Sequence, residues 1–204
     1  MLAVSEIIDE AKTIAKKYGA KGIFLGIKDD KLIEVLGFLN FNKEYSAVRM
    51  ILEDIEVKGI PLNLRILLEA NKKDYFMVYN DAFKEVPNGA TVTESEVEQY
   101  IKEQDENNCY YLAEMDDKNI GFIQFKIENG MGEFDLGLIS EVRGKSYGKR
   151  LLETAINFLN SKEVTDISLT VITSNTIAYE MYKKRGFKEV NLISDWFLLE
   201  AVSK

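Results

Sequence analysis

The sequence predicts an α/β fold, in which helices pack against a sheet, and three observations indicate it. Segments with apolar residues at helical spacing alternate along the chain with segments in which every second residue is apolar. The 204 residues are 46% hydrophobic and 29% charged, which is ordinary for a globular protein. A charged segment with glycine and proline at 53–63 divides the pattern. We therefore expect a smaller α-β-α-β half-domain at residues 1–58 and a larger domain at residues 62–204.

The smaller half-domain begins with an amphipathic helix, whose acidic residues argue against a signal peptide. Residues 7–27 align without a gap with residues 151–171, and residues 39–53 resemble residues 185–200. We interpret the N-terminal part as a degenerate copy of the helix-strand-helix-strand unit near the C-terminus, because it has no glycine-rich turn before its first helix. Any amphipathic helix followed by a strand would match in part, so the duplication is a hypothesis.

The larger domain is expected to follow the order strand, two helices, three strands, helix, strand, helix, strand. Thr93 and Glu96 have the spacing of a capping box at the start of one helix. The helix that ends at Gly186 has Ser174 or Asn175 as its expected N-cap. The expected elements lie at 64–70, 73–86, 93–104, 108–116, 119–128, 132–140, 151–159, 166–172, 174–186 and 191–202.

Composition excludes several classes of function. The chain has no histidine and a single cysteine, Cys109, so histidine-based catalysis, most zinc sites and an internal disulfide are excluded. We expect a reducing, cytoplasmic location and no metal. The net charge of −8 argues against a broad nucleic-acid surface, and no apolar run is long enough for a membrane span. Proton transfer must use Asp, Glu, Tyr, Lys, Cys or water.

The segment RGKSYGK, residues 143–149, combines cationic residues and glycines directly before a predicted helix. The first N–H groups of a helix have no intrahelical partner and, together with the helix dipole, they attract anions. Gly144 and Gly148 let the backbone approach a ligand closely, because they have no Cβ. The segment therefore predicts a phosphate site. The alternative interpretation is a solvated helix start with surface lysines.

Two motifs in the larger domain resemble those of the GNAT superfamily of acyl-CoA-dependent N-acyltransferases. The turn matches the pattern [Q/R]-x-x-G-x-[G/A] at Arg143 and Gly148, and Ser146 stands where the family has its middle glycine. The second pattern is an Asn with an Ala three residues on, a Tyr seven residues on and then Gly-Phe. It is matched by Asn175, Ala178, Tyr182, Gly186 and Phe187. The resemblance covers residues 62–204 and implies a mixed central sheet flanked by helices.

The resemblance implies transfer of an acetyl group from acetyl-CoA to a primary amine, which attacks the thioester directly. It further implies that Tyr182 protonates the leaving thiolate. Glu133 and Asp135 share one face of a strand, and we choose Glu133 as the base that deprotonates the amine; a solvated carboxylate is the alternative. The implied cofactor-binding residues are Leu136, Gly137, Leu138, Arg143, Gly144, Lys145, Ser146, Tyr147, Gly148, Lys149 and Asn175.

Two alternatives remain open beside an enzyme for a small-molecule or peptide amine. A non-catalytic sensor or scaffold would bind CoA or acyl-CoA without the chemistry, and the departure at Ser146 leaves room for it. A homodimer would use the N-terminal half as its interface. The sequence does not name the amine, because acceptor loops vary most in such folds.

Overall fold

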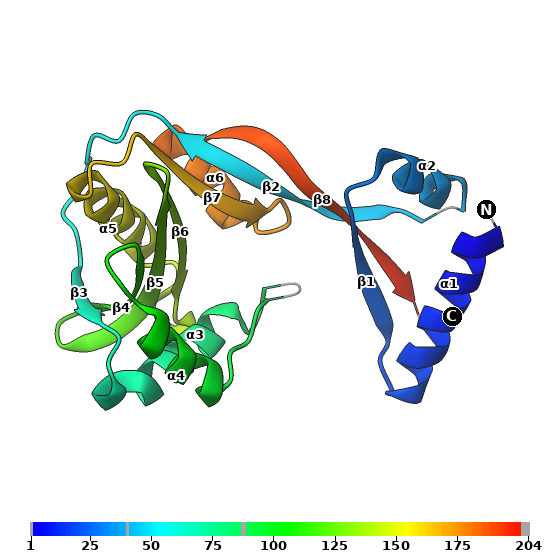
Figure 1. Ribbon diagram of the computed structural model, residues 1–204, viewed down its shortest axis with the longest axis horizontal. Coiled ribbons are helices and arrows are strands. Elements are labelled where there is room, and N and C mark those ends of the chain that lie inside the picture. Colours follow the sequence, from blue (N-terminus) through cyan, green and yellow to red (C-terminus); the bar gives the residue numbers. More distant parts are fainter. Residues whose placement is uncertain (1, 40, 87–88, 201–204) are drawn as a thin grey trace. The chain divides into compact units, whose positions relative to one another are not determined.

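The computed structural model describes residues 2–39, 41–86 and 89–200 (Figure 1). These residues form two compact units, and each is discontinuous in sequence. The first unit comprises Met1–Arg49, Val171–Tyr179 and Glu189–Lys204, and the second comprises Met50–Thr170 and Glu180–Lys188. In the part of the chain that the structure describes, no helix combines the length and the apolarity needed to cross a membrane.

The first unit is built around an antiparallel ladder. Its sheet order is β1-β8-β2, and β1 pairs with β8 from Gly22 opposite Glu200 to Ile27 opposite Asp195. Its elements are α1 (Leu2–Lys17), β1 (Gly22–Ile27), α2 (Asp30–Phe38), β2 (Lys43–Leu52) and β8 (Lys188–Glu200). Its core includes the buried side chains of Ile8, Ile27, Leu36, Phe197 and Leu199. Burial of these apolar surfaces holds the two helices against the strands.

The second unit contains a mixed sheet in the order β2-β7-β6-β5-β4-β3, in which β3, β4, β5 and β6 pair antiparallel and β6 pairs parallel with β7. Short 3₁₀ turns precede α3 and α5. Its elements are β3 (Asn63–Ile66), α3 (Lys72–Phe83), α4 (Glu94–Glu103), β4 (Asn108–Met115), β5 (Lys118–Glu128), β6 (Met131–Leu138), α5 (Tyr147–Ser161) and parts of β7 (Asp166–Ile172) and α6 (Thr176–Arg185), whose other residues belong to the first unit.

Helices cover both faces of the second unit's sheet (Figure 1). On one face, Phe122 of β5 packs against Tyr75 and Tyr79 of α3, with ring centroids 6.1 and 4.6 Å apart. On the other face, Phe125 stacks on Phe158 of α5 at 4.0 Å. Residues 122 and 125 point to opposite faces because side chains alternate along a strand. The predicted mixed sheet flanked by helices is thus confirmed.

The predicted elements are present in the predicted order, and several begin or end a few residues from the predicted position. The strand expected over 64–70 stops at Ile66, because the Asn71 side chain donates to the Ile66 carbonyl and accepts from the Leu68 N–H, which turns the chain into a 3₁₀ helix. The C-terminal segment 191–202, expected to form one or two strands, lies in the single strand β8, and positions 201–202 are outside the described residues.

Local signals were correct at two helix starts. Thr93 and Glu96 form the reciprocal capping box of α4, with the Thr93 N–H donating to Glu96 Oε2 at 2.7 Å. Asn175 Oδ1 accepts from the Ala178 N–H at 3.3 Å at the start of α6. In the compared half-repeats, β1 starts at Gly22 and β7 at Asp166, positions that the alignment pairs. The half-domain boundary itself stays a prediction.

Candidate active site

The pairing of β6 with β7 ends at Glu133, within the strand that leads to the glycine-containing turn. Their parallel ladder pairs Met131 with Asp166, Gly132 with Ile167 and Glu133 with Ser168. The next residues of β6, 134–138, lie beyond the last of these pairs while β5 pairs with their other edge. Backbone groups on the β7 side of residues 136–138 are thereby placed outside the ladder, where a ligand can meet them. These are the residues predicted to contact the pantetheine arm.

The turn after β6 has the backbone of an anion site. Gly144 and Ser146 have positive φ values of 76° and 66°, and α5 begins at Tyr147. The Ser146 side chain makes no capping hydrogen bond to α5. The first N–H groups of this 15-residue helix are therefore not satisfied by a side-chain cap and can bind an anion. Lys145 and Lys149 are exposed beside them.

Ser146 is strained, because a residue with a Cβ pays about 1 kcal/mol or more in the left-handed region that glycine occupies freely. We expect Ser146→Gly to raise the free energy of unfolding by about 1 kcal/mol, and the Tm by roughly 2–4 °C. Urea and thermal unfolding would measure the change. Ser146→Ala is the matched control, since it keeps the Cβ and should give no gain. An equal gain from both variants would contradict the strain.

Arg143 fastens the turn to α3. Its guanidinium donates to the Ala82 carbonyl at 2.6 Å and to the Leu138 carbonyl at 3.3 Å, and it pairs with Glu85 at 2.9 Å. A cation at the C-terminal end of a helix satisfies carbonyls that have no intrahelical partner. The side chain is thus engaged by the protein itself, and a contact of residue 143 with cofactor stays a prediction.

Packing explains why position 137 holds glycine, in addition to its predicted role in binding. A Cβ at this position would lie 2.7 Å from Ala82 Cβ and 2.7 Å from Phe122 Cε1. A side chain at Gly137 would therefore push α3 away from the sheet. Gly148 is less restricted, because its Cβ would lie 3.4 Å from Met181 Sδ and 3.9 Å from Leu138 Cδ1.

Tyr182, the predicted acid, is buried on α6. Its ring makes edge contacts with Phe134 of β6 and Phe187, with centroids 6.4 and 5.8 Å apart. Burial, and in second place the charge of Asp135, raise the pKa of the Tyr182 phenol above its ordinary value. The phenol is therefore protonated at neutral pH, as a general acid must be. Phe134 also places this ring beside the part of β6 that lies beyond the ladder.

The two predicted carboxylates have different environments. Glu133 is in the last pair of the β6–β7 ladder and lies opposite Lys126 of β5. Asp135 lies two residues beyond the ladder and keeps contact with solvent. Partial loss of solvation, and then the neighbouring charge of Glu133, raise the pKa of the Asp135 carboxyl to about 6, although the residue as a whole is exposed. A carboxyl with a raised pKa can take up a proton near neutral pH, so Asp135 is a candidate base beside Glu133.

Polar and aromatic groups that sequence reasoning missed surround Asp135. Gln124 lies opposite Asp135 on β5, and its Nε2 donates to the Tyr75 hydroxyl at 2.9 Å. Tyr79 lies on α3, as Tyr75 does. Burial, and then the charge of Asp135, raise the pKa of the Tyr79 phenol. Tyr100 of α4 stacks on a β4 ring at 4.6 Å. The sequence feature that could have revealed these groups is Gln124, a polar residue within the apolar run of β5.

Two further residues that the sequence analysis discussed, Asn175 and Cys109, lie outside the turn and the strand β6. Asn175 directly precedes α6, and its side-chain oxygen accepts from the backbone of that helix. Cys109 is buried in β4, and its pKa is raised by burial, which opposes the thiolate form that a nucleophile needs. The interpretation of Cys109 as a core strand residue is confirmed.

Comparisons with known proteins agree with this geometry. A sequence profile of the Acetyltransferase (GNAT) family matches residues 67–187. The chain belongs to this family.

Individual relatives match the chain in part. An uncharacterized N-acetyltransferase of Methanocaldococcus jannaschii is 32% identical over 92 residues, 44% of this chain and 59% of that protein. The ribosomal protein bS18-alanine N-acetyltransferase of Haemophilus ducreyi is 30% identical over 64 residues, 31% of this chain and 44% of that protein. The chain thus spans about half the length of these curated relatives.

A solved structure extends the likeness. The GCN5-related N-acetyltransferase of Sphaerobacter thermophilus matches with a TM-score of 0.65 at 15% identity, over 88% of this chain and 59% of that chain. At this identity the likeness shows the fold alone.

Proposed function

We propose that the protein uses acetyl-CoA to acetylate a primary amine, which attacks the thioester directly. The observation that carries this proposal is the end of the β6–β7 ladder at Glu133, on the strand that leads through the turn to a helix without a side-chain cap. An extended ligand can occupy the open strand edge with its arm and the helix start with its phosphates.

The residues present fit a CoA thioester, which supplies an activated acetyl group when bound. Backbone N–H groups of residues 144–149 would hold the diphosphate, and the exposed cations Lys145 and Lys149 would add charge beside it. Backbone groups of residues 136–138 would bind the pantetheine arm, as would the side-chain amide of Asn175.

Three steps of the reaction are assigned to this chain. Asp135 takes the proton from the ammonium form of the acceptor, with Glu133 as the alternative base. A backbone N–H within residues 136–138 polarises the carbonyl oxygen as the amine nitrogen bonds to the carbonyl carbon. Tyr182 donates its proton to the sulfur as the carbon–sulfur bond breaks, so free CoA leaves as a thiol, and the amide nitrogen then gives its remaining extra proton to the Tyr182 phenolate.

The acceptor is proposed to be a small-molecule or peptide amine. Because the Haemophilus relative is named for an alanine of a ribosomal protein, peptides with a free N-terminal alanine belong in the first substrate panel. Amino acids, polyamines and aminoglycosides complete the panel.

A transfer assay tests the proposed function. Purified protein, acetyl-CoA and each amine would be incubated, and both free thiol and acetylated amine would be measured. We expect thiol release that depends on at least one amine and equals the acetylated product. Tight CoA binding without transfer to any amine would instead indicate a sensor.

Gly148 gives a direct test of the diphosphate site. We expect Gly148→Leu to weaken CoA binding at least about 10-fold, roughly 1.4 kcal/mol, because its side chain would stand among the N–H groups that hold the diphosphate. Isothermal titration calorimetry would measure the affinity. Gly148→Ala is the folding control, since its Cβ would make only ordinary contacts with Met181 and Leu138. Equal CoA affinity of Gly148→Leu and the wild type would remove the diphosphate assignment.

A further inference from the structure

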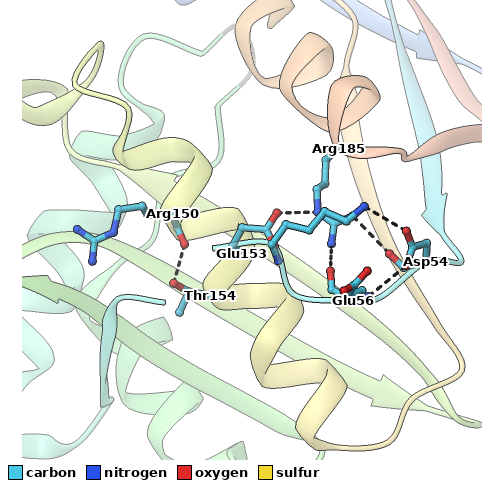
Figure 2. Close-up of polar contacts among 7 residues, drawn as sticks. Asp54, Glu56, Arg150, Glu153, Thr154 and Arg185 are labelled. Atoms are coloured by element: carbon cyan, nitrogen blue, oxygen red, sulfur yellow. Dashed lines mark hydrogen bonds and ion pairs between the residues drawn. The ribbon is translucent and has the colours of Figure 1, made fainter. Parts of the chain in front are cut away.

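A buried ion pair joins the two helices of the proposed site. Arg185, in the last turn of α6, donates from Nε to Glu153 Oε1 of α5 at 2.6 Å (Figure 2). The exposed fractions of the two side chains are 7% and 11%. Another pair nearby, Lys188 with Glu53 at 3.0 Å, has exposed fractions of 72% and 69%. The Arg185–Glu153 pair is therefore shielded from solvent, and its geometry is correspondingly specific.

The remaining donors and acceptors of the pair fasten the segment between β2 and β3. Arg185 Nη1 donates to the Asp54 carbonyl at 3.4 Å, and Nη2 donates to the Glu56 carbonyl (Figure 2). Glu153 Oε2 accepts from the Lys58 N–H at 2.9 Å. The planar guanidinium thus addresses three acceptors at once, a geometry that the point charge of a lysine cannot reproduce.

The same segment is held to α5 at further points. The Leu62 N–H donates to Thr154 Oγ1 at 2.8 Å, and Arg150 Nε donates to the Ile60 carbonyl at 3.4 Å. Segment, α5 and the end of α6 therefore form one hydrogen-bonded assembly. Arg185 links α6 to the other two parts of this assembly.

The position of Arg185 relative to the proposed chemistry gives this assembly a role. Tyr182 lies three residues before Arg185 on α6, within one helical turn. Helix α5 starts at the turn proposed to hold the diphosphate. A small displacement of an acid relative to its reacting atom can cost about 10²-fold in rate.

We infer that Arg185 and Glu153 are positioning residues, which fix the Tyr182 hydroxyl relative to the helix that starts at the cofactor turn. This inference rests on the proposed function and assigns to the pair a role that acts through Tyr182. Neither side chain touches the reacting atoms in this assignment.

A double-mutant cycle between Arg185 and Tyr182 tests the inference. The full chain would be studied as wild type, Arg185→Lys, Tyr182→Phe and the double variant, with kcat expressed per CoA-binding site from calorimetry. We expect Arg185→Lys to lower kcat about 10-fold while the Kd for CoA changes less than about 3-fold. In the Tyr182→Phe background the same substitution should lower kcat less than about 2-fold, because the group it positions is already absent.

The control is Glu53→Gln, which breaks the exposed pair with Lys188 and should leave kcat within about 2-fold of the wild type. If Arg185→Lys does not fold, Glu153→Gln enters the same cycle, since it keeps the shape of the side chain. A purely structural role would lower the Tm and would reduce kcat equally in both backgrounds.

Equal losses in both backgrounds overturn the inference, as does an unchanged kcat of Arg185→Lys. Failure of both Arg185→Lys and Glu153→Gln to fold also overturns it, because the pair then serves the fold itself. Failure of the proposed function is distinguishable, since the wild type would then acetylate no amine in the transfer assay.

Discussion

Replacement of Tyr182 by Phe is expected to lower kcat roughly 10²-fold, because the leaving thiolate loses its proton donor. The Kd for CoA should stay nearly unchanged. The substitution removes the hydroxyl and leaves the ring, whose edge contacts with Phe134 and Phe187 hold its place. Steady-state kinetics at saturating acetyl-CoA and amine, with calorimetry for CoA binding, would measure both quantities.

The control for this variant is its stability. Thermal unfolding of Tyr182→Phe should match that of the wild type closely, because in the described residues no hydrogen bond of the phenol is present to be lost. Turnover equal to that of the wild type at saturating substrates would refute the acid role. A large loss of CoA affinity with little change in kcat would show that the hydroxyl serves binding.

Replacement of Asp135 by Asn is expected to lower kcat/KM roughly 10²-fold at pH 7, because an amide cannot take the proton from the ammonium group. The wild-type kcat/KM should rise with pH through about 6, the pKa of Asp135 in the protein, since the base acts in its deprotonated form. Asp135→Asn should lose this dependence. Measuring kcat/KM against pH for both proteins with the same amine would show this loss. The ionisation of the amine affects both profiles equally, so it cancels when they are compared.

Glu133→Gln is the matched variant for the choice of base. It neutralises the carboxylate of β6 that lies in the ladder opposite Lys126, and we expect less than about a 3-fold effect if Asp135 is the base. A large loss in Glu133→Gln together with normal activity of Asp135→Asn would reverse the assignment.

The raised pKa of Asp135 also has a consequence for stability. The folded-state pKa of about 6 exceeds the ordinary value of 3.8, so ionisation of Asp135 opposes folding. This cost is absent below about pH 4, grows between pH 4 and 6, and is complete above pH 6. Asp135→Asn should therefore unfold at a higher temperature than the wild type at pH 8, with a difference that disappears at low pH. An active site that stores such a cost exchanges stability for reactivity.

Sequence patterns predicted the elements of the fold well. Apolar periodicity located α5, β7 and α6, and the capping box of α4 was correct atom by atom, because these signals depend on residues within a few positions of one another. The same patterns extended the strand at 64–70 too far, because the Asn71 side chain, five residues beyond Ile66, hydrogen-bonds the backbone there. A side chain that ends a strand in this way leaves no trace in hydrophobic spacing.

The candidate site was predictable in part. The turn at 144–149 and Tyr182 stood out through their motifs, whereas Gln124, Tyr75 and Arg185 did not. Gln124 meets Tyr75 across 49 positions, and Arg185 meets Glu153 across 32. No local signal reports contacts at such separations.

The sequence by itself determined the family, the order of elements and the residues of the two motifs, because all of these reside in short-range spacing. Only the tertiary structure shows how the surroundings of the two candidate carboxylates differ. It places Glu133 inside the β6–β7 ladder and Asp135 beyond it, among protein atoms that raise its pKa. Two carboxylates two residues apart on one strand look alike in a sequence, because desolvation depends on what the rest of the chain packs around each of them.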